Sequence, residues 1–245
     1  MKIMNLNYDY DNVLSIVPHY IQYPQMLPWV GVDYKKYNFL IVGESHYLPQ
    51  KSTIHLSSIQ WYDSSISGLN EDEINWSHTR NVISCGHNQY WQYKGHTIFR
   101  NLERSILDSG FNPNDKSSMF RYISYLNFFQ RPAVTGLSLN YDERDVSISI
   151  DVFQQVISIL RPTKIAFVSK KPWDICIYKG IVKWDNNLKK YIIPDDYLIC
   201  TEYFPHPACR WWNKESLQYQ LYRDGIRRNG RKKFIEFIRY ENIFI

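Results

Sequence analysis

The sequence predicts an α/β protein with three layers (α/β/α), in which helices cover both faces of a central four-stranded parallel sheet. Four short apolar runs are nearly continuous rather than alternating, which is typical of strands that are buried on both faces. Helix candidates lie between the runs, so strand, helix and strand recur in turn. The predicted strands are residues 37–42, 122–129, 164–169 and 197–201.

Two helices are predicted between these strands. Residues 97–109 carry an apolar stripe on one face and stop at Gly110. Residues 151–160 open on Asp151 as a candidate N-cap and must end before Pro162. Helices that cross over a parallel sheet in this way leave the ligand site at the carboxyl ends of the strands.

Composition limits the class of protein. Hydrophobic residues make up 44% of the 245 residues, which excludes a disordered chain and favours one domain over residues 1–245. No apolar run approaches the roughly 18 residues of a membrane span. The four cysteines form no CxxC pair and no compact framework. We therefore expect a monomeric cytoplasmic protein that does not contact a membrane.

Two further segments differ in character from the strands and helices. Residues 48–94 are long, polar and aromatic without clear periodicity, which predicts an elaborated loop or lid. Residues 214–245 are predicted as a basic helical segment, which indicates either an anionic partner or a solvated helix face. The basic residues of this segment are Arg223, Arg227, Arg228, Arg231, Lys232, Lys233 and Arg239.

Polar side chains lie at or just after the carboxyl ends of three of the predicted strands. Glu44 stands directly after the first strand, Asn127 lies in the second, and His206 follows the fourth. A site at this edge of the sheet would therefore hold a carboxylate, an amide and an imidazole around one ligand.

The order of these motifs resembles the uracil-DNA glycosylase superfamily. "VGESHY" is similar to its first motif, "YLNFFQRP" to its second and "FPHPACR" to its third. "LRPTKIAFVS" and "YKGHTIFRNLERSILDSGF" are similar to the segments between the motifs. The resemblance covers about residues 37–213 and implies a divergent member of this superfamily.

The resemblance implies a monofunctional DNA glycosylase, which flips a base out of the helix and hydrolyses its N-glycosidic bond. Glu44 would activate water and stabilise positive charge on the sugar. His206 would donate a hydrogen bond to O2 of the departing pyrimidine. Asn127 would bind the Watson–Crick edge of the base through its amide.

The resemblance also assigns roles around the base and the DNA. Tyr93 matches the stacking aromatic, and Tyr47 matches a residue that guards the pyrimidine 5-position. Ser45 and His46 would complete the wall of the base site. The DNA contacts, including a wedge that enters the stack, would come from Arg131, Arg210, Trp211 and Trp212.

Some positions depart from the family pattern. Ser45 replaces an aspartate, His46 replaces a proline, and Ala208-Cys209 replaces Ser-Pro. The substrate is therefore expected to be uracil or a modified pyrimidine, including the bulky bases of phage DNA, in base-excision repair or antiviral defence. Residues 1–84 contain no cysteine, so we expect no iron-sulfur cluster. No other metal and no cofactor are expected.

Four other interpretations stay open. Ser45, His206 and either Asp195 or Asp196 occur in a triad order that would suit an esterase-type hydrolase. Cys209 beside His206 is a weaker candidate nucleophile. The fold could also serve as a binding module for nucleic acids or nucleotides without catalysis. A zinc site would have to use His78, Cys85, His87 and His96, whose spacing matches no common pattern.

The candidate residues also have purely structural interpretations. Glu44 could cap a turn, and His206 could be a hydrogen-bonded core histidine. Asn127 could tie down backbone at a strand end. Aromatic candidates, namely Tyr47, Tyr93, Trp211 and Trp212, could simply pack in the core or against the C-terminal helix.

Overall fold

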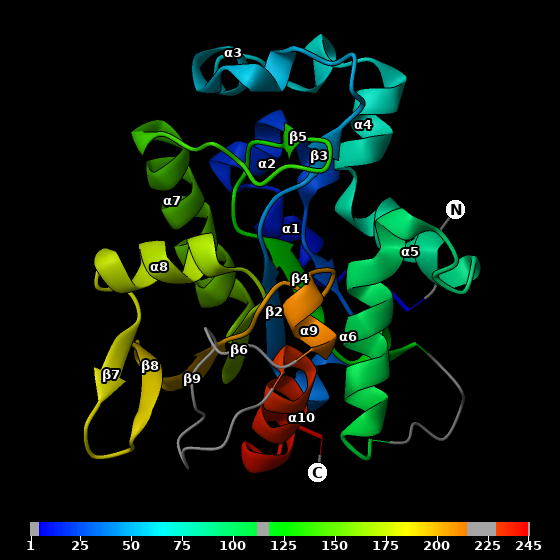
Figure 1. The fold of residues 1–245 in the computed structure, drawn as a ribbon. Coiled ribbons are helices and arrows are strands. Elements are labelled where there is room, and N and C mark those ends of the chain that lie inside the picture. Colours follow the sequence, from blue (N-terminus) through cyan, green and yellow to red (C-terminus); the bar gives the residue numbers. More distant parts are fainter. Residues whose placement is uncertain (1–4, 112–117, 215–228, 245) are drawn as a thin grey trace.

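The computed structural model describes residues 5–111, 118–214 and 229–244, and in them a seven-stranded mixed sheet carries helices on both faces (Figure 1). The strand order is β1-β4-β2-β6-β9-β8-β7. The strands are β1 (Trp29–Val30), β2 (Phe39–Gly43), β4 (Ser124–Asn127), β6 (Lys164–Phe167), β7 (Lys183–Asp185), β8 (Lys190–Pro194) and β9 (Leu198–Tyr203). A separate pair joins β3 (Tyr47–Leu48) to β5 (Ala133–Val134).

The predicted α/β class is confirmed, but the prediction of a four-stranded parallel sheet is wrong. The four predicted strands are β4, β2, β6 and β9, and they do pair in parallel. However, β1 adds antiparallel at one edge, and the β7–β8 hairpin adds antiparallel at the other. The hairpin is only partly buried and β1 is two residues long, so neither produces a continuous apolar run.

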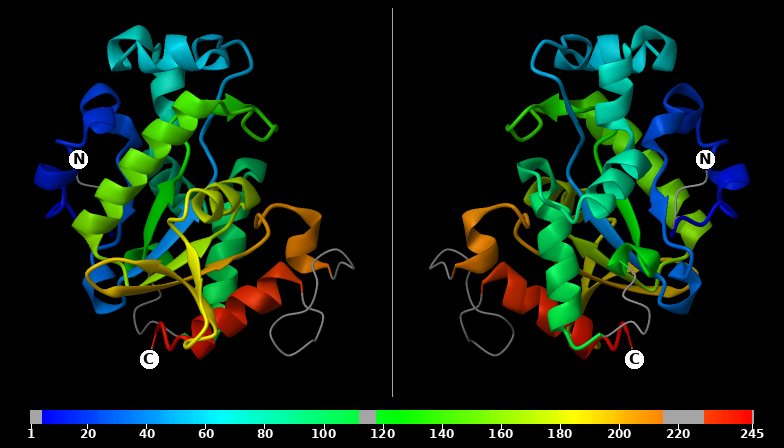
Figure 2. Two further views of the ribbon diagram at one scale, coloured as in Figure 1. Left: turned by 90° about the vertical axis from the view of Figure 1, so that its left-hand side faces the viewer. Right: turned by 90° about the vertical axis from the view of Figure 1, so that its right-hand side faces the viewer.

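Alternate residues of β2 face two separate hydrophobic clusters. Leu40 and Val42 belong to a cluster with α7 (Glu143–Leu160) and α8 (Lys170–Tyr178). Phe39 and Ile41 belong to a second cluster with α6 (Thr97–Asp108) and α10 (Gly230–Tyr240). Helices thus cover both faces of the central strands, as the two side views show (Figure 2).

The two predicted helices differ in how well the sequence located their starts. Helix α6 agrees with the prediction to within a residue. Helix α7 starts well before residue 151, because Asp142 accepts hydrogen bonds from the amides of Arg144 and Asp145 as the true N-cap. The prediction of Asp151 as N-cap is wrong. The helix ends at Leu160, and the C-cap residue Arg161 has a left-handed φ of 50°.

Residues 48–94 are folded rather than an irregular loop, and they form α3 (Ser58–Tyr62), α4 (Glu71–Ser77) and α5 (Thr79–Asn88). The side chain of Trp61 in α3 stacks on Tyr23 at 4.3 Å between ring centroids and donates a hydrogen bond to Gln130 O. These contacts fix the segment to the rest of the domain, above the carboxyl edge of the sheet (Figure 1).

Short helical elements connect the larger ones. They are α1 (Asp11–Leu14), α2 (Pro18–Gln22), η1 (Pro24–Met26), η2 (Tyr34–Lys36), η3 (Ile54–Leu56), η4 (Ile66–Gly68), η5 (Lys94–His96), η6 (Met119–Arg121) and α9 (Arg210–Asn213). In the described part of the chain, no helix is both long and apolar enough to cross a membrane.

Arg131 is a structural residue, so its predicted contact with DNA is wrong. Its side chain is buried and donates to both carboxylate oxygens of Asp145, at 2.8 and 2.5 Å. A third bond goes to the carbonyl oxygen of His55 at 2.7 Å. The guanidinium therefore ties the start of α7 to the segment that contains α3.

The described part of the basic C-terminal segment is bound to the domain. In α10, Arg231 pairs with Asp108, and Lys233 pairs with Glu202 at 2.9 Å. Arg239 donates to the carbonyl oxygens of Asp108 and Ser109. These cations hold α10 against α6 and β9. Three further predicted members of the basic face, Arg223, Arg227 and Arg228, lie outside the described residues.

Candidate functional site

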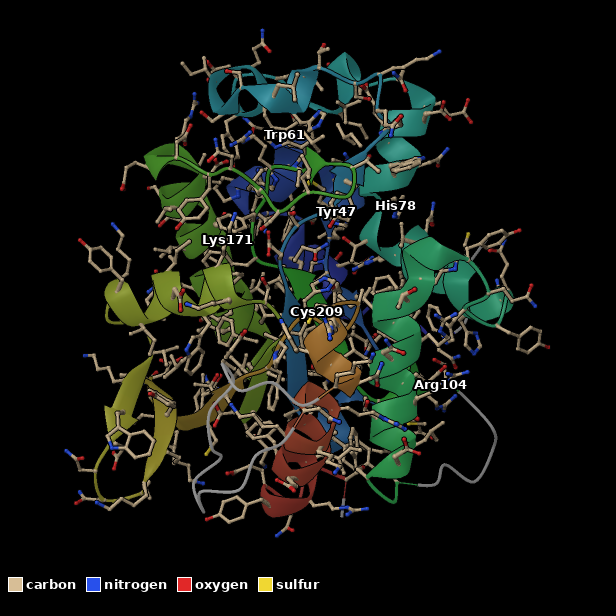
Figure 3. All side chains as sticks on the ribbon, viewed as in Figure 1. Tyr47, Trp61, His78, Arg104, Lys171 and Cys209 are labelled. Carbon is tan, nitrogen blue, oxygen red and sulfur yellow. The ribbon has the colours of Figure 1, made fainter. Side chains whose placement is uncertain are left out.

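Four polar side chains meet at the carboxyl ends of the parallel strands. Glu44 directly follows β2, Asn127 ends β4, Ser169 follows β6, and His206 follows β9. Gly43 pairs in register with Asn127, which places Glu44 and Asn127 on neighbouring strands. Figure 3 labels Tyr47, Lys171 and Cys209, which lie on three elements around this edge: β3, α8 and the loop before α9.

The Glu44 carboxylate is held by three donors. Its Oε2 accepts a 2.5 Å hydrogen bond from the Ser169 hydroxyl. Its Oε1 accepts bonds from the Leu139 amide, at 3.1 Å, and from the Ser138 hydroxyl. Lys171 fixes the same loop by donating to Leu139 O at 2.5 Å. Glu44 is only partly buried, and these bonds orient its carboxylate.

His206 presents a neutral imidazole whose proton is on Nε2. The backbone amide of Ala208 donates to Nδ1 at 3.2 Å, which requires Nδ1 to be unprotonated. Burial lowers the pKa of His206, and the nearby negative charge of Glu44 opposes that shift. The loop itself is fixed by Asn101, whose amide donates to Pro207 O at 2.7 Å.

Asn127 is held by a tyrosine two residues before it. Its Oδ1 accepts a 3.0 Å hydrogen bond from the Tyr125 hydroxyl, and both residues are buried. Gly43 makes this arrangement fit, because a Cβ there would lie 2.1 Å from the Tyr125 oxygen and 2.6 Å from Asn127 Oδ1. The glycine of the "VGES" run is thus required by close packing under the amide.

Tyr47 lies beside Glu44 at the rim of the site. Its side chain is 38% exposed, and burial together with the Glu44 charge raises its pKa. Ser45 is partly buried in the same stretch.

His46 does not lie with Glu44, Asn127 and His206, so its prediction as a base-binding residue is wrong. The ring is buried, and its Nε2 lies 3.0 Å from Thr79 Oγ1 in α5. Burial lowers the pKa of His46 to about 3. The side chain therefore joins the central sheet to the segment 48–94.

Tyr93 is not joined to the other candidates. Its side chain is exposed, and its ring contacts His96 edge-on at 5.8 Å between centroids. Within the described residues no hydrogen bond or ring contact links Tyr93 to Glu44, Asn127 or His206. Its stacking role stays a prediction.

Of the three residues predicted around the DNA wedge in α9, Arg210 and Trp211 remain candidates and Trp212 does not. Trp212 is fully buried and packs on Phe234 at 5.6 Å between ring centroids, so its prediction as a DNA wedge is wrong. Arg210 is exposed, and its guanidinium lies 5.2 Å from the ring of the half-buried Trp211. Helix α9 and the loop that follows β5 project from the same side of the molecule (Figure 2).

The geometry excludes the triad of an esterase. Asp195 and Asp196 precede β9, whereas His206 follows it. A six-residue strand separates its ends by about 20 Å, so neither aspartate can orient His206. Burial raises the pKa of Cys209, which disfavours a thiolate nucleophile.

Across residues 5–111, 118–214 and 229–244, no group of three His, Cys, Asp or Glu side chains is arranged to hold a metal ion. A small hollow beside α5 is lined by residues that include Trp29, Ile83 and His87, and none of the site residues borders it.

Comparison with known proteins adds no assignment: no protein-family model matches the chain, and no curated protein matches it significantly. Sequence reasoning missed Tyr125, Ser138, Ser169 and Lys171. Only Ser169 carried a usable signal, because it ends a predicted strand at the edge where ligands are expected.

Proposed function

We propose that this chain is a divergent member of the uracil-DNA glycosylase superfamily and acts as a monofunctional DNA glycosylase. The observation that carries the proposal is the proximity of an oriented carboxylate, Glu44, to a neutral His206 that bears its proton on Nε2. The base-binding amide of Asn127 lies on the neighbouring strand end.

The two groups suit opposite charges of the transition state. As the N-glycosidic bond breaks, its electron pair leaves with the base and positive charge develops on the sugar. Glu44 stabilises that charge and takes a proton from the water that attacks C1′. His206 donates from Nε2 to O2 of the departing pyrimidine, where negative charge collects.

The substrate is a uracil or a modified pyrimidine in DNA. Tyr47 stands at the rim beside Glu44, where it would meet a substituent on the 5-position of the base. The exposed Arg210 and its neighbour Trp211 would contact the DNA around the extruded nucleotide. A cytoplasmic role in repair or in defence against phage DNA follows from either substrate.

A panel of duplexes tests the proposal. Oligonucleotides that carry uracil, 5-hydroxymethylcytosine or a glucosylated cytosine are incubated with the protein, and alkali-labile sites are counted. We expect strand cleavage after alkali on at least one duplex, with loss of that cleavage in Glu44→Gln.

Two other outcomes would replace the proposal. Tight binding to DNA without any abasic product, unchanged in Glu44→Gln, would indicate a binding module. Hydrolysis of acyl esters that disappears in Ser45→Ala would indicate an esterase, which the position of Asp195 and Asp196 argues against.

A further inference from the structure

The buried Tyr125 has a hydroxyl with a single role in the described structure. The side chain is 2% exposed and lies on β4 in the cluster between the sheet and α6. In the part of the chain that the structure describes, the one hydrogen bond of this hydroxyl goes to Asn127 Oδ1, at 3.0 Å. Burial raises the pKa of Tyr125, so the hydroxyl keeps its proton and remains a donor.

This bond selects one orientation of the Asn127 amide. An isolated asparagine can rotate its amide by half a turn, which exchanges the acceptor Oδ1 and the donor Nδ2. After that rotation the Tyr125 oxygen would accept a bond from Nδ2–H, and the Tyr125 proton would be left buried with no acceptor among its described partners. The phenol packs closely over Gly43, where an added Cβ would lie 2.1 Å from the Tyr125 oxygen.

The orientation matters because the two classes of pyrimidine present opposite patterns. A 4-oxo pyrimidine such as uracil has an acceptor at O4 and a donor at N3. A 4-amino pyrimidine such as cytosine has a donor at N4 and an acceptor at N3. An amide that bonds to both position 3 and position 4 of one class of pyrimidine must therefore rotate by half a turn to bond to the other class.

We propose that Tyr125 is a positioning residue that determines specificity: it holds the Asn127 amide in one orientation, so the site discriminates between 4-oxo and 4-amino pyrimidines. The inference rests on the proposed function, since it assigns a role within the same base site.

A pair of matched bases tests the inference. 5-Hydroxymethyluracil and 5-hydroxymethylcytosine carry the same 5-substituent and differ at position 4. Single-turnover excision rates are measured on duplexes with each base, and the ratio of the two rates is compared between wild type and Tyr125→Phe. We expect the ratio to move toward one by about tenfold or more, because the amide can then turn over.

Tyr34→Phe is the matched control. Tyr34 is equally buried, its hydroxyl has no partner in the described structure, and it belongs to the cluster on the other face of the sheet. The rate ratio should stay at the wild-type value in this variant. An unchanged ratio in Tyr125→Phe, whatever the absolute rates, would overturn the inference and leave the glycosylase proposal standing.

Binding of the free bases separates the two proposals. If wild type excises neither base, tryptophan fluorescence gives the dissociation constants of free uracil and free cytosine. The ratio of these two constants is then compared between wild type and Tyr125→Phe. A tenfold change of that ratio in Tyr125→Phe would support the role of Tyr125 while the proposed catalysis fails. No measurable binding of either base would overturn both.

Discussion

The Ser169 hydroxyl donates a 2.5 Å hydrogen bond to Glu44 Oε2, which joins the carboxyl ends of β6 and β2. A bond to a charged acceptor contributes about 1.5–3 kcal/mol, and each 1.4 kcal/mol of transition-state stabilisation is a factor of ten in rate. We expect Ser169→Ala to lower the single-turnover rate of base release by about tenfold or more.

The matched control for Ser169 is Ser105→Ala. Ser105 is also buried, but its hydroxyl bonds to Asn101 O within its own helix. It should leave the rate within about twofold of wild type. Equal rates in the two variants would show that the Ser169 bond does not orient the reacting carboxylate.

The proximity of Glu44 and His206 can be measured without a substrate. Burial lowers the pKa of His206, while the Glu44 charge raises it. In an NMR titration of the imidazole, the midpoint should lie below the ordinary value of about 6.5. Glu44→Gln removes the charge that favours imidazolium, so the midpoint should fall further. A rise in this variant would contradict the arrangement described for the two groups.

The buried His46 should make the free energy of unfolding depend on pH. Its folded pKa is about 3, whereas an unfolded histidine has a pKa of about 6.5. Between these values the unfolded chain binds a proton that the folded one does not, so stability is complete above pH 6.5 and is lost as the pH falls. His46 alone should account for about 2 kcal/mol between pH 6.5 and pH 5.

Urea unfolding at the two pH values measures this effect. The difference in unfolding free energy between pH 6.5 and pH 5 should be smaller in His46→Gln than in wild type. His19, whose pKa burial also lowers to about 3, supplies a similar contribution that the variant retains. The same pH dependence in both proteins would show that His46 is not buried in its neutral form.

The two adjacent tryptophans should behave differently. Trp212 is fully buried, so Trp212→Ala should cost about 3–5 kcal/mol of unfolding free energy. Trp211 is half-buried beside Arg210, so Trp211→Ala should instead weaken DNA binding by about tenfold. Thermal unfolding and fluorescence anisotropy with a DNA duplex separate the two effects. Unchanged DNA affinity in Trp211→Ala would show that this residue of α9 does not contribute to DNA binding.

Hydrophobic patterning predicted the four central parallel strands of the sheet and missed the strands at its two edges. The continuous apolar runs of β2, β4, β6 and β9 are produced by burial on both faces. The β7–β8 hairpin packs at an edge, so its burial leaves no such run. Segment 48–94 was misjudged because its helices are short, although Asn70 and Glu73 form a capping box that marks the start of α4.

The site was predictable where a residue follows a strand, and not where tertiary contacts decide its role. Glu44 and His206 were found because strand ends converge in a parallel sheet. The burial of Trp212 depends on its contact with Phe234 of α10, and that of Arg131 on its pairing with Asp145. Neither pairing has a local sequence signal, so exposed and buried roles could not be distinguished beforehand.

The proposed function requires the Glu44 carboxylate to promote hydrolysis of a base from DNA. The most direct measurement is the single-turnover rate of base release by wild type and by Glu44→Gln, with the affinity for the same duplex measured in parallel. We expect Glu44→Gln to lose roughly 10²- to 10⁴-fold in rate, with affinity within a few-fold of wild type. A variant that releases the base as fast as wild type would contradict the proposed function.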